Sequence, residues 1–361
     1  MKTILYIGKY NGIIGGIERY MQKSAELLQQ YGFAVHYRYI ESGGKNKSAF
    51  AGAFESVKIF SGDDEILQSA DMVILHNIIE VKYLKNLSRK KTFFFAHDHN
   101  IYCQRHHYYM PVGRINCHRA YNKFICQLCS LWQNPAPPLK EYRQFPALVL
   151  SDFMAENLQK NGFEKVIKLP AFIKTVEKER SFLPNGVLRI LFLGQLIRGK
   201  GADLMLKALK KLDIPFFCTI AGDGKDRVML EKMVEKFKLC DKVHFTGFVS
   251  EPELLWENCD LFCFPIRWQE PFGLVGLEAM AHGVPVAAFD YGSVREWLTH
   301  GENGLLLPGK NHVKLAGALK KSAQNAAELE RMGRNGINTV KEKFSEENFV
   351  NIFKSIAESL S

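Results

Sequence analysis

Short apolar runs recur along the chain, and amphipathic segments separate them. Runs as apolar as these are typical of strands that are buried on both faces of a parallel sheet. In the first half they predict strands at 3–8, 34–40, 72–76, 92–97 and 147–151. In the second half they predict strands at 188–194, 216–222, 242–247, 260–265 and 285–290. Apolar residues at helical spacing predict helices at 17–31, 200–212, 227–237 and 273–282.

This alternation of strand and helix occurs twice in 361 residues, which predicts an α/β fold with two doubly wound, Rossmann-like domains. A charged stretch at 176–186 ends in Pro-Asn-Gly and marks the boundary. We therefore predict one domain over 1–180, a second over 181–345, and a C-terminal helix over 346–361 that packs back on the first domain. Ligands of open parallel sheets bind beyond the carboxyl ends of the strands, so the site is expected in a cleft between the domains.

The composition excludes several classes of protein. With 47% hydrophobic and 24% charged residues, the chain is neither disordered nor fibrous. No run approaches the roughly 18 apolar residues of a membrane span. The apolar stretch near the N-terminus is also too short for the core of a signal peptide. We expect a cytoplasmic protein whose eight cysteines are reduced or bind a metal.

The net charge is +10, and nearly all of the excess lies in the first half. Residues 1–180 hold 25 Lys and Arg against 16 Asp and Glu, whereas residues 181–361 hold 23 against 22. A basic half attracts phosphate-bearing partners, which leaves nucleic acid, an anionic membrane surface and an anionic acceptor open. A merely solubilising surface is the alternative interpretation.

The strongest chemical signal is EPFGLVGLEAMAHGVPV at 270–286. Glu270 follows a predicted strand, and Phe272, Gly273 and Leu274 lead into a helix whose first amides suit a phosphate. Glu278 lies on the same helix, near that end. Two carboxylates can accept hydrogen bonds from the hydroxyls of a ribose and of a sugar. Taken alone, the two acids are better interpreted as a helix cap, Glu270, and a solvated helix residue, Glu278.

With these residues in view, the sequence resembles the family 4 glycosyltransferases, whose signature is E-x7-E within EPFGL…EAMA. Further segments fall in the family's order: GQLIRGKG (194–201), AGDG (221–224), FTGFV (245–249), FPIRWQEPFG (264–273) and EWLTHGENGLLL (296–307). The resemblance implies the GT-B architecture, in which two Rossmann-like domains face a central cleft and the second holds the nucleotide. It also implies sugar transfer with retained anomeric configuration from a UDP- or GDP-linked donor. The expected acceptor is a glycan or a lipid-linked molecule, in cell-surface polysaccharide or glycolipid synthesis.

The resemblance assigns roles to single residues. Glu278 would bind the donor ribose, Glu270 the donor sugar and Lys200 the diphosphate. The family usually has an arginine where this chain has Gln195, so Arg198 is either its replacement or a plain surface residue. Cations and a helix start can neutralise the leaving diphosphate, and no Asp-x-Asp element stands in a suitable loop. We therefore predict that transfer needs no metal and no other cofactor for catalysis.

The first half adds further candidates. Gly15 and Gly16 follow the first predicted strand and precede a helix, so backbone amides there can approach a phosphate or sugar. Glycine turns are common, and it is the family's GG at this place that indicates donor binding. His97 ends a predicted strand, where the family often has a histidine that contacts donor or acceptor. Asp98 is expected to orient its imidazole; a polar loop residue is the alternative.

Residues 99–146 form a long insert without aliphatic runs. It contains Cys103, Cys117, Cys126 and Cys129, the last two as C-x2-C, which can place two thiolates on one metal ion. Some members of the resembling family have a similar pattern after the same strand. A structural zinc site and reduced buried cysteines are both open, and an iron–sulfur cluster is a third alternative.

Basic and aromatic residues alternate through the same insert, including Arg105, Arg114, Arg119 and Trp132. They favour an anionic lipid-linked acceptor and peripheral contact with the inner face of the plasma membrane over nucleic acid. A solvated loop whose aromatics are held by the cysteine cluster is the other interpretation. We therefore expect no nucleic-acid partner. The alternative functions are a sugar-nucleotide epimerase or phosphorylase of the same architecture, and a zinc-containing nucleic-acid-binding protein.

Overall fold

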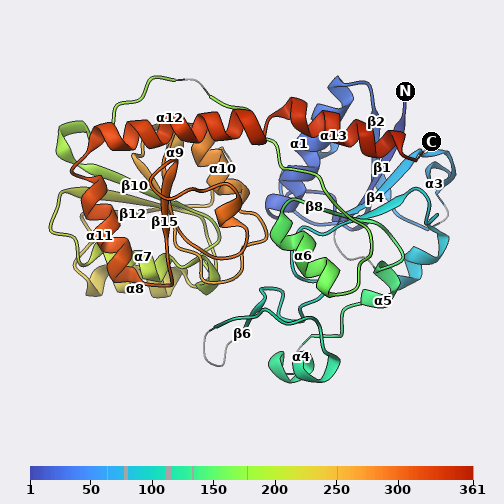
Figure 1. Cartoon of the computed structure of the whole chain (residues 1–361), viewed down its shortest axis with the longest axis horizontal. Coiled ribbons are helices and arrows are strands. Elements are labelled where there is room, and N and C mark those ends of the chain that lie inside the picture. The colour runs from blue at the N-terminus through green and yellow to red at the C-terminus, as the bar shows by residue number, and fades with distance from the viewer. Residues whose placement is uncertain are drawn as a thin grey trace. The chain divides into compact units, whose positions relative to one another are not determined.

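The chain forms two compact α/β units in the computed structural model, which describes residues 1–62, 64–76, 80–110, 115–131, 134–176, 178–249 and 251–360 (Figure 1). The first unit is Met1–Ala171 with Glu346–Ser361, and the second is Phe172–Ser345. The division therefore follows Ala171, not residue 180. Residues 172–180 belong to the second unit because their backbone is bonded there: Ile173 N donates to Phe344 O (2.9 Å) and Val176 N to Ala281 O (2.9 Å).

The first unit contains a parallel sheet of seven strands in the order β3-β2-β1-β4-β5-β8-β9. The strands are β1 (Thr3–Tyr10), β2 (Ala34–Glu41), β3 (Ser56–Ile59), β4 (Met72–His76), β5 (Thr92–Phe95), β8 (Ala147–Val149) and β9 (Val166–Lys168). The helices are α1 (Gly16–Gln30), α2 (Lys47–Ala51), α3 (Ile66–Ser69), η1 (Val81–Asn86), α5 (Leu139–Tyr142), α6 (Asp152–Lys160) and α13 (Glu346–Glu358). All five strands predicted for this half are confirmed, and β3 and β9 are additional.

The second unit contains a parallel sheet of six strands in the order β12-β11-β10-β13-β14-β15. The strands are β10 (Leu188–Leu193), β11 (Phe216–Ala221), β12 (Val243–Gly247), β13 (Leu261–Phe264), β14 (Val286–Phe289) and β15 (Gly304–Leu307). The helices are α7 (Ala202–Leu209), α8 (Arg227–Lys236), α9 (Glu253–Glu257), α10 (Leu274–Ala281), α11 (His312–Ser322) and α12 (Ala326–Lys343). Short 3-10 turns are η3 (Pro184–Gly186), η4 (Arg198–Lys200) and η5 (Val294–Glu296). The predicted strands of this half are also confirmed, and β15 is additional.

Each sheet has a topological switch point, where the strand order reverses. In the first sheet, β1 lies between β2 and β4, and in the second β10 lies between β11 and β13. Loops that leave the carboxyl ends of two such neighbouring strands diverge to opposite faces of the sheet, which leaves a crevice for a ligand. The switch points are therefore where candidate residues are expected within each unit.

The C-terminal helix α13 lies in the first unit, on α1 and the start of β2. The ring of Phe349 contacts Tyr20 edge-on at 6.5 Å, and Phe353 contacts Phe33 in the same way at 5.5 Å. Lys2 Nζ donates to Ala357 O (2.7 Å). Within the described ranges, no helix combines the length and the apolar character that crossing a bilayer requires.

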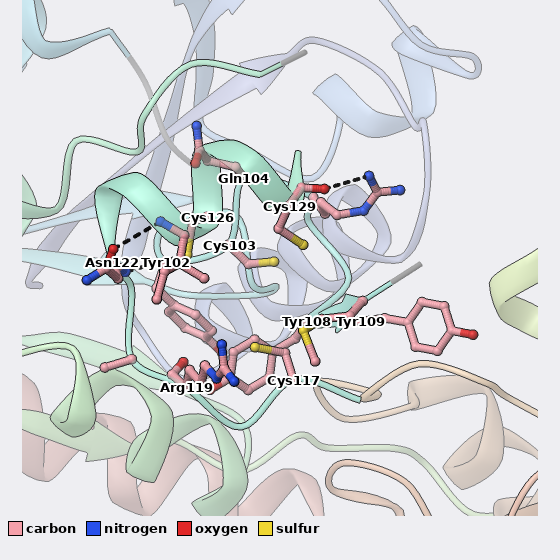
Figure 2. Close-up of a pocket in the computed structure, with 14 residues that line it drawn as sticks. Tyr102, Cys103, Gln104, Tyr108, Tyr109, Cys117, Arg119, Asn122, Cys126 and Cys129 are labelled. Atoms are coloured by element: carbon pink, nitrogen blue, oxygen red, sulfur yellow. Dashed lines mark hydrogen bonds between the residues drawn. The ribbon is translucent and has the colours of Figure 1, made fainter. Parts of the chain in front are cut away.

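The insert leaves the first sheet after β5 and returns at α5. It carries a two-stranded antiparallel ribbon, β6 (Tyr109–Met110) with β7 (Ile115–Asn116), and the helix α4 (Lys123–Cys129) (Figure 2). Arg114 and Trp132, named above among its basic and aromatic residues, lie outside the described residues.

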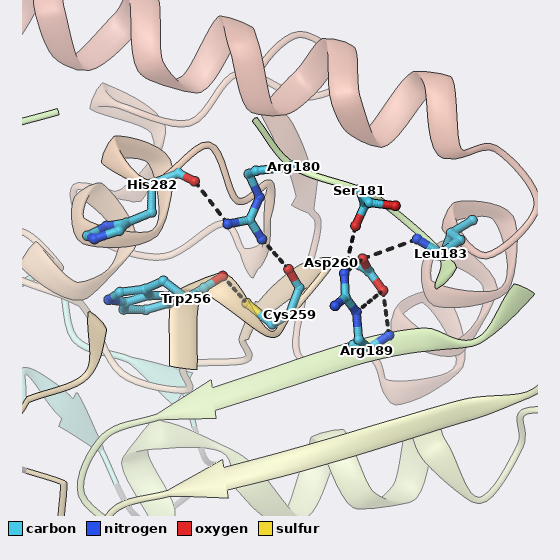
Figure 3. A network of polar contacts seen from close by, with 8 residues as sticks. All are labelled: Arg180, Ser181, Leu183, Arg189, Trp256, Cys259, Asp260 and His282. Atoms are coloured by element: carbon cyan, nitrogen blue, oxygen red, sulfur yellow. Dashed lines mark hydrogen bonds and ion pairs between the residues drawn. The ribbon is translucent and has the colours of Figure 1, made fainter. Parts of the chain in front are cut away.

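A buried carboxylate joins β10 and β13 in the second unit (Figure 3). Asp260, whose side chain is fully buried, accepts hydrogen bonds from the backbone N of Leu183 (3.2 Å) and of Arg189 (2.8 Å). The Arg189 guanidinium completes the set, with Nη2 at 2.6 Å and Nε at 3.1 Å. These bonds raise the pKa of Arg189. A buried carboxylate cannot hydrogen-bond to water, so it depends on these donors. Removing the Asp260 carboxylate would leave one guanidinium and two backbone amides without this acceptor.

We predict that Asp260→Ala lowers the free energy of unfolding by about 3 kcal/mol, since it removes one partner of a buried ion pair. Asp213→Ala is the matched control, because Asp213 pairs with Lys320 on the surface and should leave stability nearly unchanged. Urea unfolding followed by tryptophan fluorescence reports on this unit through Trp256, Trp268 and Trp297. Equal stability of the two variants would contradict the prediction.

Candidate functional site

Lys200 and Glu270 form an ion pair at the switch point of the second sheet. Lys200 Nζ lies 3.0 Å from Glu270 Oε2, and the Trp268 indole N–H donates to the same oxygen (3.2 Å). The ammonium also lies 5.3 Å from the centre of the Trp268 ring and 5.6 Å from that of Phe264. The side chains of Lys200 and Glu270 are only 22% and 10% exposed. Partial burial and an aromatic wall strengthen this charge interaction relative to one in open water.

Two glycines allow the loops after β10 and β13 to touch. A Cβ on Gly199 would lie 1.9 Å from the Trp268 ring, and one on Gly201, at φ +78°, would lie 1.8 Å from Pro265 O. Arg267 N donates to Gly199 O (2.8 Å) and ties the loops together. Close packing of the two loops therefore explains the glycines on both sides of Lys200.

The backbone of Glu270 is held by the loop after β14. Its carbonyl oxygen accepts from Ser293 N (3.0 Å) and from Ser293 Oγ (3.1 Å). Gly292 N donates to the Gln269 side-chain oxygen (3.0 Å). Three loops of one sheet edge thus fix the position of the Glu270 carboxylate, as a preorganised site requires.

The start of α10 stands beside this ion pair. Gly273 directly precedes the helix and has φ +92°. A Cβ added to Gly273 would lie 3.4 Å from Cγ of Glu270. Phe272 is buried, and its carbonyl accepts from the Trp297 indole (2.8 Å). Leu274 begins the helix, and in its first turn Gly276 N donates to Gly273 O (2.8 Å). The amides that open a helix lack the i−4 partners of its interior, which suits them to an anion. Glu278 is half-buried on α10, with its backbone oxygen 2.8 Å from His282 Nδ1.

Further cations lie at the same sheet edge. Arg267, which we did not single out from the sequence, forms an ion pair with Asp203 and donates to Arg198 O (3.2 Å). Lys310 follows β15, and burial, with a contribution from Arg267, lowers its pKa to about 8. Arg198 and Gln195 are both exposed, so a replacement role for Arg198 stays a prediction. The edge can supply several positive charges to an anion.

Gly15 and Gly16 stand at the switch point of the first sheet, where β1 leads into α1. Apart from chain neighbours and the backbone of α1, no atom of the described residues lies within 4 Å of a Cβ added to either residue, so packing does not explain the glycines. Gly15 N donates to the Glu18 carboxylate (2.9 Å), which caps α1. The bare backbone leaves the approach to this helix open, which suits a ligand that needs close contact.

His97 forms a pair with His76, a residue that the sequence analysis did not select. His76 ends β4 at the same switch point, and its Nδ1 lies 2.8 Å from His97 Nε2. The His97 ring stacks on Phe95 with centres 4.3 Å apart and meets Tyr20 edge-on at 5.5 Å. Burial lowers the pKa of His97 to about 3 and that of His76 well below its usual value. Both imidazoles are therefore neutral at physiological pH.

The pair restricts where the two protons sit. His76 Nε2 is buried and has no hydrogen-bond partner among the described residues. A proton there would be an unpaired buried N–H, which costs more than an unpaired lone pair. His76 therefore carries its proton on Nδ1 and donates to Nε2 of His97, which leaves the His97 proton on Nδ1. The site then contains a neutral imidazole donor of fixed orientation.

Asp98 does not orient His97 in the way expected from the sequence. Its carboxylate accepts from Asn100 N and from Asn100 Nδ2, both at 2.9 Å, and His76 takes the orienting role instead. Burial raises the pKa of Asp98 to about 6. The signal that would have identified His76 is the same one that selected His97, a polar residue closing a buried strand.

Cys103, Cys117, Cys126 and Cys129 line one cavity of about 40 Å³ in the insert, as the sequence pattern led us to expect of a cluster. The structure thus groups the candidates into three sets. Lys200, Glu270, Gly273 and Glu278 lie at one switch point, the glycines and His97 at the other, and the cysteines in the insert.

The family-model match lies within the second unit. Residues 173–339 match the family model of glycosyl transferases group 1. The uncharacterized glycosyltransferase MJ1607 of Methanocaldococcus jannaschii is 32% identical over 179 residues, 47% of this chain and 46% of that protein. A D-inositol 3-phosphate glycosyltransferase of Pseudarthrobacter chlorophenolicus is 31% identical over 193 residues, 51% of this chain and 46% of that protein. The matches thus span about half the length of these curated relatives.

Solved structures resemble the whole chain. Alr3699/HepE of Anabaena in complex with UDP-glucose superposes with a TM-score of 0.75 at 17% identity, covering 100% of this chain and 99% of that one. TarM of S. aureus, solved with UDP, fondaparinux and α-GlcNAc-glycerol, gives 0.77 at 13%, covering 99% and 100%. The predicted GT-B fold is confirmed.

We predict that His76 sets the tautomer of His97. In 15N-histidine-labelled protein, long-range 1H–15N spectra should show His97 protonated on Nδ1. His76→Phe removes the donor at similar bulk and should shift His97 toward the Nε2–H form, whereas His76→Asn, which keeps an N–H near that position, should retain much of the Nδ1–H form. His97→Gln identifies the signal among the 11 histidines. Finding His97 protonated on Nε2 in the native protein would refute the assignment.

Proposed function

We propose that this protein transfers a sugar from a nucleoside-diphosphate donor, UDP- or GDP-linked, to a glycan or lipid-linked acceptor. The observation that carries the proposal is the Lys200–Glu270 ion pair at the switch point, beside the N-terminus of the helix that bears Glu278. The family-model match over 173–339 and the GT-B fold support it. Cell-surface polysaccharide or glycolipid synthesis is the process that we propose for it.

The donor diphosphate would lie at Lys200 and the first turn of α10. An ammonium has three N–H donors, so Lys200 can hold Glu270 and still donate to phosphate oxygens. The helix N-terminus adds oriented amides and a partial positive charge. As the glycosidic bond breaks, negative charge grows on the diphosphate, and these groups stabilise it without a metal ion. Arg198 and Arg267 are additional cations of the same edge.

The two carboxylates would bind the neutral parts of the donor. Glu278 accepts from the vicinal hydroxyls of the ribose, and Glu270 from hydroxyls of the transferred sugar. His97, as an uncharged donor, would bind a sugar oxygen, and the backbone at Gly15 and Gly16 would approach the donor closely. We propose retention of the anomeric configuration, with the leaving diphosphate accepting the acceptor proton as the new bond forms. The acceptor lies mainly on the first unit, with peripheral contact to an anionic membrane.

The two alternative enzymes, an epimerase and a phosphorylase, differ from a transferase in their substrates or products. An epimerase converts the nucleotide sugar and releases no free nucleotide, whereas a phosphorylase requires phosphate. If the release of UDP or GDP increases when an acceptor is added, the result supports a transferase and neither alternative. The anomeric coupling of the first product in 1H NMR then distinguishes retention from inversion.

We predict that Lys200→Met lowers kcat/KM for sugar transfer by about 100- to 1000-fold, because it removes a cation from the developing diphosphate. Glu278→Gln should weaken UDP or GDP binding by about tenfold or more, since one partner of charged hydrogen bonds is lost. Turnover of a nucleotide-sugar panel measures the effect of Lys200→Met, and nucleotide-dependent thermal shifts measure that of Glu278→Gln.

Adding or omitting Mg²⁺ and Mn²⁺ should leave the rate of sugar transfer unchanged.

Exposed ion pairs supply matched controls. Lys320→Met and Glu328→Gln change the same residue types in surface pairs with Asp213 and Arg331, and should leave transfer and binding as in the native protein. If Lys200→Met and Glu278→Gln bind nucleotide and turn over as well as these controls, the proposed donor site is wrong.

A further inference from the structure

The insert contains a cavity lined by four thiols, none of which belongs to either switch-point set. Cys103, Cys117, Cys126 and Cys129 all contribute to its wall (Figure 2). Its volume of about 40 Å³ exceeds the roughly 10–15 Å³ that one water molecule requires. The space is therefore large enough for a single ion.

Separate elements bring the thiols to this cavity. Cys103 lies in the loop after β5, and Cys117 directly follows β7, with its N bonded to Tyr108 O (2.9 Å). Cys126 and Cys129 lie three residues apart on α4, so they share one face of the helix. Asn122 caps α4 by accepting from Ile125 N (3.0 Å). The cap fixes where the helix begins and thus which face carries the two thiols.

Apolar packing does not explain the position of α4. None of its seven residues is buried, and Phe124 and Leu128 are 75% and 59% exposed. A helix this short is not stable in water by itself. The neighbouring ribbon pairs only two residues on each strand. The residues of α4 that turn inward are the two cysteines and Gln127, which are half-buried.

The charges around the cavity suit bound thiolates. Four thiolates on a divalent ion carry a net charge of −2, and Arg105 and Arg119 line the same cavity. Arg105 Nη1 donates to Cys129 O (3.2 Å) and so stands beside the C-x2-C turn.

We propose that Cys103, Cys117, Cys126 and Cys129 bind one zinc ion, which holds the insert together. In the described part of the chain, no three His, Cys, Asp or Glu side chains are arranged to hold a metal ion. Binding therefore requires the four side chains to rotate into the cavity until each sulfur lies about 2.3 Å from the metal. Each thiol loses one proton to solvent and forms one Zn–S bond, so four protons are released and nothing is oxidised or reduced.

The metal content of the full chain tests this proposal without any assay of sugar transfer. After purification with zinc present and exhaustive dialysis, mass spectrometry of the metal should find about one zinc per chain. Cobalt substitution should give the thiolate-to-cobalt charge-transfer band of a sulfur-ligated site. Removing the metal should lower the temperature at which the first unit unfolds.

Cys126→Ser/Cys129→Ser should abolish stoichiometric zinc, because a serine hydroxyl is a poor zinc ligand. Cys240→Ser is the matched control, since Cys240 is exposed in the second unit and should leave the zinc content unchanged. A native chain that takes up no zinc, that contains iron, or that loses no zinc in the double variant would overturn the proposal. Because none of these readouts involves a nucleotide, a failure here leaves the proposed transferase activity untouched.

Discussion

The ion pair between Lys200 and Glu270 is the interaction on which the second unit's site depends. It joins two loops that leave β10 and β13 toward opposite faces of the sheet, at the point where such loops would otherwise separate. Gly199 and Gly201 let the loops meet, and Ser293 fixes the Glu270 backbone from a third loop. The pair therefore has a structural purpose when no ligand is present, and it keeps a cation and a carboxylate at fixed positions for one.

The same edge concentrates charge that the fold must keep in place. Arg267 is satisfied by Asp203, whereas Lys310 is partly desolvated near Arg267, which lowers its pKa to about 8. A cation whose pKa is lowered by burial is stabilised when an anion binds beside it. Shifted pKa values of this kind are common at binding sites. A site assembled in advance also avoids rearranging dipoles during the reaction.

The sequence predicted the interior of both sheets because their central strands are continuous apolar runs. It missed β3, β9 and β15, which lie at sheet edges: β3 has no buried residue, and β9 spans three residues. Glu270 stands out because it follows a predicted strand, but the roles of Glu270, Glu278 and Lys200 come from the resemblance of their motifs to the family 4 glycosyltransferases. It did not select Trp268, since the role of that residue depends on which loops become neighbours, and strand order cannot be read from local pattern. His76 was missed although it closes a buried strand as His97 does, because only their pairing across neighbouring strands shows its role. The Asp98 expectation was wrong because adjacency in sequence does not give side-chain direction.

The two units present different chemistry at their switch points. The first unit's candidate residues are uncharged: glycine backbone and two histidines that burial keeps neutral. In the second unit, by contrast, Lys200 and Glu270 form an ion pair. The proposed function calls on both kinds of chemistry, because a nucleoside-diphosphate sugar contains an anionic diphosphate and a neutral polyol. A neutral imidazole can donate a hydrogen bond to a hydroxyl, whereas a cationic imidazole would also attract anions. Burial and the pair with His76 keep charge off both rings, so the switch point of the first unit is suited to hydrogen bonding and not to charge pairing.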